Sequence, residues 1–195
     1  MTPPNALTLS RFALTALLMA FLFLPIPLGP SLALAAFILA AVSDAVDGHL
    51  ARTVYGVTPF GALLDPLADK VLVCAAFVSF VQIGLVPAWI AVLILSREFL
   101  VTGLRVLAGA RGRPIAARAW GKHKTAWQLV VILVLLAGHA VRRDLLPGRA
   151  PHLLASFDVW FEAVAFVIAI GAAVITVASG AVYFHQHRDL LAEHL

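Results

Sequence analysis

Charged residues are scarce in this sequence of 195 residues. Asp, Glu, Lys and Arg together make up 12% of it, hydrophobic residues make up 62%, and the mean hydropathy is +0.99. Soluble domains contain about 25% charged and about 45–50% apolar residues, so the composition excludes a soluble globular protein. It also excludes an intrinsically disordered chain, because so much apolar surface does not remain in water.

Cysteine is almost absent, since Cys74 is the single one in the chain. It forms no internal disulfide and supports no cysteine-based metal site, and its apolar neighbours indicate a packing role. Histidine does not supply an alternative metal site. We interpret four histidines in polar surroundings as solvated side chains: His123, His185, His187 and His194. Internal repeats and low-complexity segments are lacking as well.

Apolar runs are abundant, and they predict six transmembrane helices in one polytopic, all-α domain over residues 1–195. A membrane helix needs about 20 apolar residues, and clusters of Pro and Gly separate runs of about that length. The predicted spans are residues 7–28, 32–52, 62–83, 87–107, 120–140 and 159–184. The first run resembles a secretory signal, but a second run follows almost at once, so we predict a retained span.

The basic residues predict the orientation of these spans. The chain has 14 Lys and Arg residues and a net charge of +4. With both termini in the cytosol, only Arg142, Arg143 and Arg149 lie outside it, as the positive-inside rule requires. The basic excess thus indicates topology rather than nucleic-acid binding. We predict a multi-pass protein of a bacterial inner (cytoplasmic) membrane, which the lack of an evident transit peptide favours over the alternative of an organellar membrane.

The second and third predicted spans carry charge close to the membrane. The uncharged run of the second span ends at Ser43, before Asp44, and that of the third begins only after Lys70. Each run alone is too short to cross a hydrocarbon core of about 30 Å. Charges at this depth need protein, ion or water partners, so we predict a polar cavity that faces the cytosol.

Four aspartates flank the connection between these two spans. Asp44 and Asp47 are three positions apart, and Asp65 and Asp69 are four apart, so each pair shares one face of a helix. The short connection makes the helices antiparallel neighbours, and the pairs can converge. Carboxylates that face one another repel unless a cation lies between them. An all-oxygen ligand set favours one or two Mg²⁺, Mn²⁺ or Ca²⁺ ions over Zn²⁺.

The residues between the aspartates suit a phosphate ligand. Gly48 and Ala51 leave one helix face bare, and Arg52 follows one turn after Gly48 with a guanidinium that can bind a phosphate. A single Asp in this segment could be a solvated helix end. Four of them at this spacing, with small residues and an Arg between them, indicate a site instead.

This segment resembles the signature of the CDP-alcohol phosphotransferases, D-x2-D-G-x2-A-R-x8-G-x3-D-x3-D. Every fixed position of the signature is matched, at Asp44, Asp47, Gly48, Ala51, Arg52, Gly61, Asp65 and Asp69. The resemblance implies a fold of six transmembrane helices, usually in a homodimer. It also implies an enzyme that transfers a phosphatidyl or related group from a CDP-linked donor to an alcohol and releases CMP.

The resemblance assigns roles to individual residues. It implies that two divalent cations, Mg²⁺ or Mn²⁺, are held by Asp44, Asp47, Asp65 and Asp69, and that Asp69 also acts as the general base. The residues that it implies for the CDP donor are Gly48, Ala51, Arg52, Thr58, Gly61, Asn5 and Thr8.

A set of basic residues from Arg97 to Lys124, here called the basic wall, predicts the kind of acceptor. For Arg111 and Arg113 the simpler explanation is a cytosolic loop that touches anionic lipid. Arg97 and Glu98, however, interrupt an apolar span, where charge is costly and usually functional, although a structural ion pair is the alternative. A cationic wall opposite a metal site suits an acceptor with a phosphate. The residues predicted to bind the acceptor phosphate are Arg11, Arg97, Arg105, Arg118, Lys122 and Lys124.

Residues from about Asn5 to Val130 are similar to the branch of that family that makes phosphatidylglycerophosphate. This similarity implies that CDP-diacylglycerol and sn-glycerol 3-phosphate are the substrates. Two alternatives stay open: the same chemistry with phosphatidylglycerol, inositol phosphate or serine as acceptor, and a cation-coupled membrane transporter. Beyond about Arg142 no motif is present, and we expect the charged residues there to lie in a loop and a tail.

Overall fold

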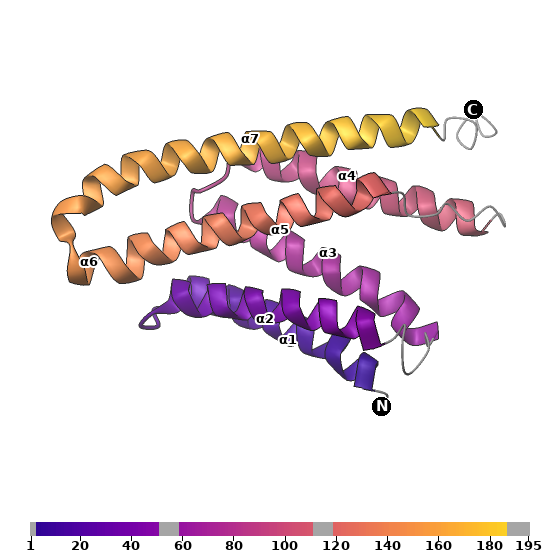
Figure 1. Cartoon of the computed structure of the whole chain (residues 1–195), viewed down its shortest axis with the longest axis horizontal. Helices are drawn as coiled ribbons and strands as arrows, with labels where there is room; N and C mark the ends of the chain where they lie inside the picture. The colour runs from indigo at the N-terminus through magenta and orange to yellow at the C-terminus, as the bar shows by residue number, and fades with distance from the viewer. Residues whose placement is uncertain (1–2, 51–58, 111–118, 187–195) are drawn as a thin grey trace.

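The computed structural model describes residues 3–50, 59–110 and 119–186, and within these ranges the chain is helical, with turns and no strand. Six long α-helices lie in these ranges, and the connections that the structure describes are short turns, a π-helical segment, a short α-helix and a 3-10 turn (Figure 1). Their bounds are α1 Pro3–Phe23, α2 Gly29–Leu50, α3 Pro59–Gln82, α4 Ala88–Ala110, α5 Ala119–Ala140, η2 Val141–Leu145, α6 Leu146–Arg149, η3 Pro151–Leu153 and α7 Leu154–Gln186.

Each long helix corresponds to one predicted span, so the all-α class is confirmed. Two helical stretches in the described part of the chain are long and apolar enough to cross a membrane, Ala126–Leu145 and Leu154–Gln186. Two shorter apolar stretches, Leu9–Phe23 and Gly29–Asp44, lie in α1 and α2. Charged side chains shorten the apolar windows of the other helices, and six membrane spans stay a prediction.

The helices form two groups, which Figure 1 shows as a lower and an upper part. α1 packs along α2 and α3, α4 packs along α7, and α5 contacts both α2 and α7. The end of α2, the start of α3, the end of α4 and the start of α5 all lie toward the same end of the molecule, on the right in Figure 1. The segments that carry the predicted site therefore meet at one end of the bundle.

A tight turn sets the register of α1 against α2. Leu28 adopts a positive φ of 58°, and the next residue, Gly29, begins α2. A Cβ atom at Gly29 would lie 2.5 Å from the backbone oxygen of Phe21. Only glycine permits this close approach of the two backbones, so this turn helps to align Arg11 of α1 with the end of α2.

Small side chains allow the helices to pack closely. Alanines line α2 and α7 in the core, where larger residues such as Phe37 and Phe77 fill the remaining space. Close packing on small residues is typical of helices that associate in lipid. The buried alanines of these two helices are Ala33, Ala36, Ala40, Ala165, Ala169, Ala172 and Ala173.

The charged residues between positions 142 and 162 lie in helical segments rather than in a loop, contrary to the sequence-based expectation, whereas those of the expected tail lie outside the described residues. Arg142 and Asp144 belong to the π-helical segment η2, which continues α5. Asp144 Oδ2 accepts hydrogen bonds from the backbone N–H of Ser31 (2.8 Å) and from its hydroxyl (2.6 Å). These residues connect α2 to the α5–α7 connection, and the pattern was missed because the partners lie far apart in the sequence.

Candidate functional site

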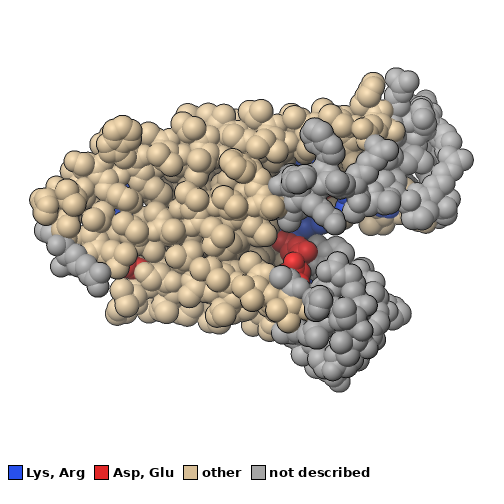
Figure 2. All heavy atoms as spheres, in the orientation of Figure 1, with Lys and Arg blue, Asp and Glu red and all other residues tan. Residues whose placement is uncertain are grey.

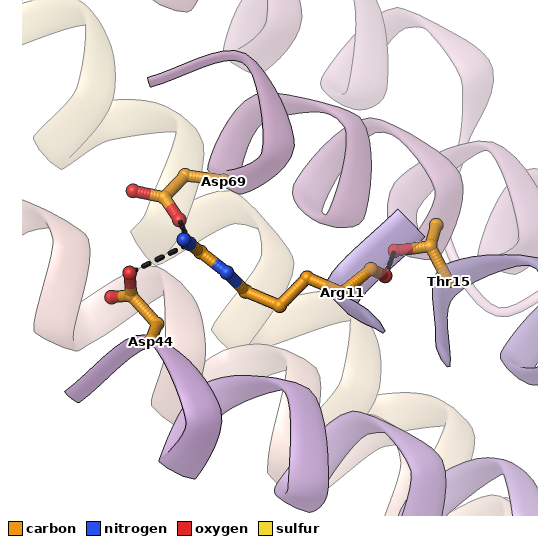
Figure 3. Close-up of polar contacts among 4 residues, drawn as sticks. All are labelled: Arg11, Thr15, Asp44 and Asp69. Carbon is orange, nitrogen blue, oxygen red and sulfur yellow. Dashed lines mark hydrogen bonds and ion pairs between the residues drawn. The ribbon is translucent and has the colours of Figure 1, made fainter. Parts of the chain in front are cut away.

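Arg11 of α1 joins the acidic segments of α2 and α3. Its Nη1 donates hydrogen bonds to Asp44 Oδ1 at 2.7 Å and to Asp69 Oδ1 at 2.5 Å (Figure 3). The Arg11 side chain is 1% exposed, whereas both aspartate side chains are 50% exposed. One buried guanidinium therefore holds two carboxylates whose other sides are open to a ligand.

The local structure of α1 supports this position of Arg11. The hydroxyl of Thr15, one turn later, donates to the Arg11 carbonyl oxygen at 2.8 Å (Figure 3). Thr15 is itself buried. Arg11 and Thr15 thus form a small polar interior in an apolar helix, and the guanidinium extends from it toward the other two helices.

The structure brings Asp44 and Asp69 together, as their places at the ends of two antiparallel helices led us to expect. It also places Arg11 between them, which the sequence reasoning missed because it considered Arg11 only as a ligand of the acceptor phosphate. A signal was present in the sequence, because a lone Arg in an apolar helix needs an anionic partner. The sequence did not indicate which acids would supply it.

Several predicted site residues cannot be placed in detail. Asp47 and Gly48 belong to α2, Gly61 and Asp65 to α3, Asn5 and Thr8 to α1, and Lys122 and Lys124 to α5, but their side chains lie outside the described part of the structure. Ala51, Arg52, Thr58 and Arg118 lie wholly outside the described residues.

The donor set at the acidic end fits a hard divalent cation. Asp44 and Asp69 bring carboxylate oxygens from two helices to the same atom, Arg11 Nη1, and Asp47 and Asp65 lie about one turn from them in the same helices. Carboxylate oxygens are the ligands preferred by Mg²⁺, Mn²⁺ and Ca²⁺. Among the side chains that the structure describes, no group of three potential metal ligands occurs. Asp44 and Asp69 are the two members of the predicted set of four aspartates whose side chains are described.

Arg97 lies on α4 in a poorly satisfied environment. Its side chain is 14% exposed, and its Nη1 is 3.4 Å from Glu98 Oε1, a long contact. Its Nε is buried and has no hydrogen-bond partner among the described residues. Glu98 also accepts a hydrogen bond from Gln128 Nε2 of α5, at 3.3 Å. Glu98 therefore links α4 to α5, and the charge of Arg97 is only weakly compensated.

Arg105, two turns after Arg97, contacts a residue that the sequence reasoning did not select. Its Cζ lies 5.6 Å from the ring centroid of Tyr183 in α7, and its Nε donates to the Tyr183 hydroxyl at 3.4 Å. Tyrosine at the end of an apolar helix is usually explained as a membrane-interface residue. No sequence signal connected Tyr183 with Arg105, which lies 78 positions earlier.

The acidic and basic residues share one recess of the molecule. Figure 2 shows acidic atoms at the inner end of an indentation, with basic atoms along the edge above them. Arg97 and Arg105 lie close enough for their charges to repel, and Lys70, directly after Asp69, lies close enough to interact with both. Cations that converge in this way favour a bound anion.

Comparison with known proteins agrees with this arrangement. The sequence model of the family described as CDP-alcohol phosphatidyltransferase matches residues 1–178 of the chain. This match confirms the resemblance seen in the aspartate signature, and it extends over helices that the signature does not include.

Individual relatives agree with the family model. The CDP-diacylglycerol--glycerol-3-phosphate 3-phosphatidyltransferase of Bacillus subtilis (strain 168) is 38% identical over 200 residues, which cover 96% of each chain. The protein of the same name from Cereibacter sphaeroides is 40% identical over 139 residues, covering 69% of this chain and 63% of that one. A rice protein named cardiolipin synthase (CMP-forming) is 34% identical over 151 residues, covering 70% of this chain and 46% of that one.

Proposed function

The chain belongs to the CDP-alcohol phosphatidyltransferase family, and from this premise we propose that it transfers the phosphatidyl group of CDP-diacylglycerol to sn-glycerol 3-phosphate. The products are phosphatidylglycerophosphate and CMP. The observation that carries the proposal is the similarity to the Bacillus subtilis enzyme of that name along 96% of both chains. The weakly compensated charge of Arg97 beside Arg105 adds support, because it suits an acceptor with a phosphate.

The donor binds at the acidic end of the bundle. Its CDP group lies against α2 and the start of α3, where the candidate contacts are Gly48, Ala51, Arg52, Thr58 and Gly61, with Asn5 and Thr8 of α1. Divalent cations, Mg²⁺ or Mn²⁺, would be held by Asp44, Asp47, Asp65 and Asp69. The chemistry that such ions supply is electrostatic, since they offset the charge of the diphosphate and of the leaving CMP.

Asp69 is the proposed catalytic base. The primary hydroxyl of glycerol 3-phosphate forms a bond to the β-phosphorus of the donor, the bond from that phosphorus to CMP breaks, and Asp69 accepts the hydroxyl proton. The half-exposed side chain of Asp69 supports this role, because an acceptor can reach it. Arg11 hydrogen-bonds to Oδ1 and so orients the carboxylate.

The acceptor phosphate binds to the basic wall, through Arg97 and Arg105 and, from the segments beyond, Arg118, Lys122 and Lys124. Arg11 is a further candidate ligand. Its contacts with Asp44 and Asp69 mean that a phosphate bound to Arg11 would lie directly beside the acids. Binding the phosphate at the wall and the hydroxyl at Asp69 orients the acceptor for in-line attack.

The proposed setting is the bacterial inner membrane, crossed six times, with both termini and the recess on the cytosolic side and the protein as a homodimer. Every long helix supports this setting by exposing large apolar side chains, which need lipid or a partner to cover them. Examples, one from each helix, are Leu17 (44% exposed), Leu39 (58%), Val78 (48%), Val92 (60%), Val130 (47%) and Val167 (66%).

The assay that tests the function measures CMP release by the purified protein in detergent. CDP-diacylglycerol and Mg²⁺ or Mn²⁺ are combined in turn with glycerol 3-phosphate, phosphatidylglycerol, inositol phosphate and serine. We expect release with glycerol 3-phosphate. The similarity to the rice protein named cardiolipin synthase makes the phosphatidylglycerol arm the most informative alternative. Release only with another alcohol would refute the acceptor, and metal-dependent solute flux without any CMP would indicate a transporter.

A further inference from the structure

The last helix, α7, carries no motif, yet it packs against α4, which carries Arg97 and Arg105 of the basic wall. It packs along α4 over much of its length (Figure 1). Two of its residues, one turn apart, meet the two arginines of α4. Gly180 lies beside Arg97, and Tyr183 lies beside Arg105.

The contact at Gly180 depends on the absence of a side chain. A Cβ atom built there would lie 3.0 Å from Cγ of Arg97, so the Arg97 side chain would have to shift to restore an ordinary packing distance. Gly180 is buried, and Arg97 is mostly buried against it. Glycine at this position therefore makes room for the aliphatic part of Arg97 to pass along α7, with its charge close to that of Arg105.

The contact at Tyr183 is electrostatic. The guanidinium of Arg105 is exposed, and an exposed Arg loses about 2 kcal/mol of side-chain entropy when it is ordered. The aromatic ring at 5.6 Å and the hydroxyl at 3.4 Å favour one position of the guanidinium. Without them, repulsion from Arg97 and Lys70 would favour positions of the Arg105 guanidinium farther from these two cations.

We propose that α7 completes a subsite for a phosphate monoester, with Tyr183 as the positioning residue for Arg105 and Gly180 as the residue that admits Arg97. The proposal rests on the proposed function, in which these two arginines bind the acceptor phosphate. In this proposal α7, which carries no motif, takes part in recognising the acceptor. Tyr183 itself does not touch the reacting atoms.

Replacing Tyr183 tests the proposal by separating the two substrates. Tyr183→Leu removes the ring and the hydroxyl, and we expect it to raise KM for glycerol 3-phosphate about three- to tenfold, the range of one cation–π contact. KM for CDP-diacylglycerol and kcat should change less than about twofold. Tyr183→Phe keeps the ring and loses only the long hydrogen bond, so it should restore most of the acceptor affinity.

Two matched controls lie on the same helix. Phe166→Leu makes the same aromatic-to-aliphatic change at an exposed position (45%), and it should leave both KM values unchanged. Gly180→Ala should raise KM for glycerol 3-phosphate, whereas Gly171→Ala should not, because a Cβ atom at Gly171 would meet nothing within 4 Å. Melting temperatures of all variants, measured in the same detergent, exclude a general loss of folding.

Binding of inorganic phosphate gives a second measurement that does not depend on turnover. Calorimetry should show weaker phosphate binding by Tyr183→Leu than by the native protein, and recovery in Tyr183→Phe. Unchanged phosphate binding and unchanged KM in Tyr183→Leu would overturn the proposal. So would equal losses for both substrates that Tyr183→Phe does not restore. If the native protein releases CMP only with an alcohol that lacks a phosphate, the proposed function fails, whatever the result for Tyr183.

Discussion

Among the side chains that the structure describes, an arginine contacts two acids at each end of the helical bundle, but the two groups differ in burial and in how far apart along the chain their members lie. At the site end, Arg11 is 1% exposed and joins α1 to α2 and α3, through partners 33 and 58 positions away. At the other end, Arg142 is 26% exposed and contacts Asp158 at 2.8 Å and Glu162 at 3.2 Å, one turn apart on α7. The two groups are far apart, because Ser31, which binds Asp144 near Arg142, and Asp44 lie near opposite ends of α2. At 1.5 Å per residue, these two positions of the helix are roughly 20 Å apart.

This difference separates a site from a structural link. Asp144, two positions after Arg142, accepts hydrogen bonds from Ser31 in the first turn of α2. Backbone N–H groups at the start of a helix favour a negative charge. Asp44 and Asp69 share one nitrogen of Arg11 and keep half of their surface open. The acids at the Arg142 end therefore hold helices together, whereas the acids at the site end remain able to bind a ligand.

The largest expected effect is loss of catalysis at the site end. Asp69→Asn removes the proposed base, so CMP release should fall by at least about a hundredfold, while binding of CDP-diacylglycerol to the detergent-solubilised protein stays measurable. Asp158→Asn, the same change at the far end, should leave turnover near the native rate. Near-native turnover by Asp69→Asn would contradict its role.

Removing Arg11 should have the largest effect on stability. Arg11→Met leaves two carboxylates facing each other, and we expect the free energy of unfolding to fall by about 2 kcal/mol, less than for a fully buried pair because the aspartates are half exposed. Thermal unfolding in detergent measures this change. Arg11→Lys keeps the charge and should recover part of the loss. A melting temperature equal to that of the native protein would show that the buried arginine does not hold the acids.

Asp144→Ala should have a smaller effect on stability and none on activity. It removes an acceptor from the start of α2, and helix caps of this kind contribute about 1 kcal/mol. A lower melting temperature with unchanged KM for both substrates is the expected result. A selective rise in KM for either substrate would mean that the far end communicates with the site, and the comparison between the two ends would lose its basis.

The smallest expected effect is that of Arg142→Met. Partly exposed ion pairs contribute about 0–1 kcal/mol, so the melting temperature should change little. Comparing the fall in melting temperature for Arg142→Met with that for Arg11→Met measures how much burial of the arginine contributes to stability. Comparable losses from the two substitutions would show that the groups are equivalent.

Much of the fold could be predicted because hydropathy is a local property. Apolar runs bounded by Pro and Gly indicated six helices, and each appears with ends within several residues of the prediction. The pairing of Asp44 with Asp69 could also be anticipated, since helical spacing and a short connection constrain where they lie. The prediction was weakest after residue 142, where the apolar pattern alone did not show that Arg142 and Asp144 join helices.

The sequence by itself determined the helical class, the family and the positions of the acidic and basic residues, because spacing along a helix is a matter of counting. Only the tertiary structure decided that Arg11 lies between Asp44 and Asp69, and that Tyr183 and Gly180 lie behind the arginines of α4. These partners are brought together by the packing of whole helices. Which side chain balances a given charge depends on which helices pack together, and no local pattern in the sequence shows this.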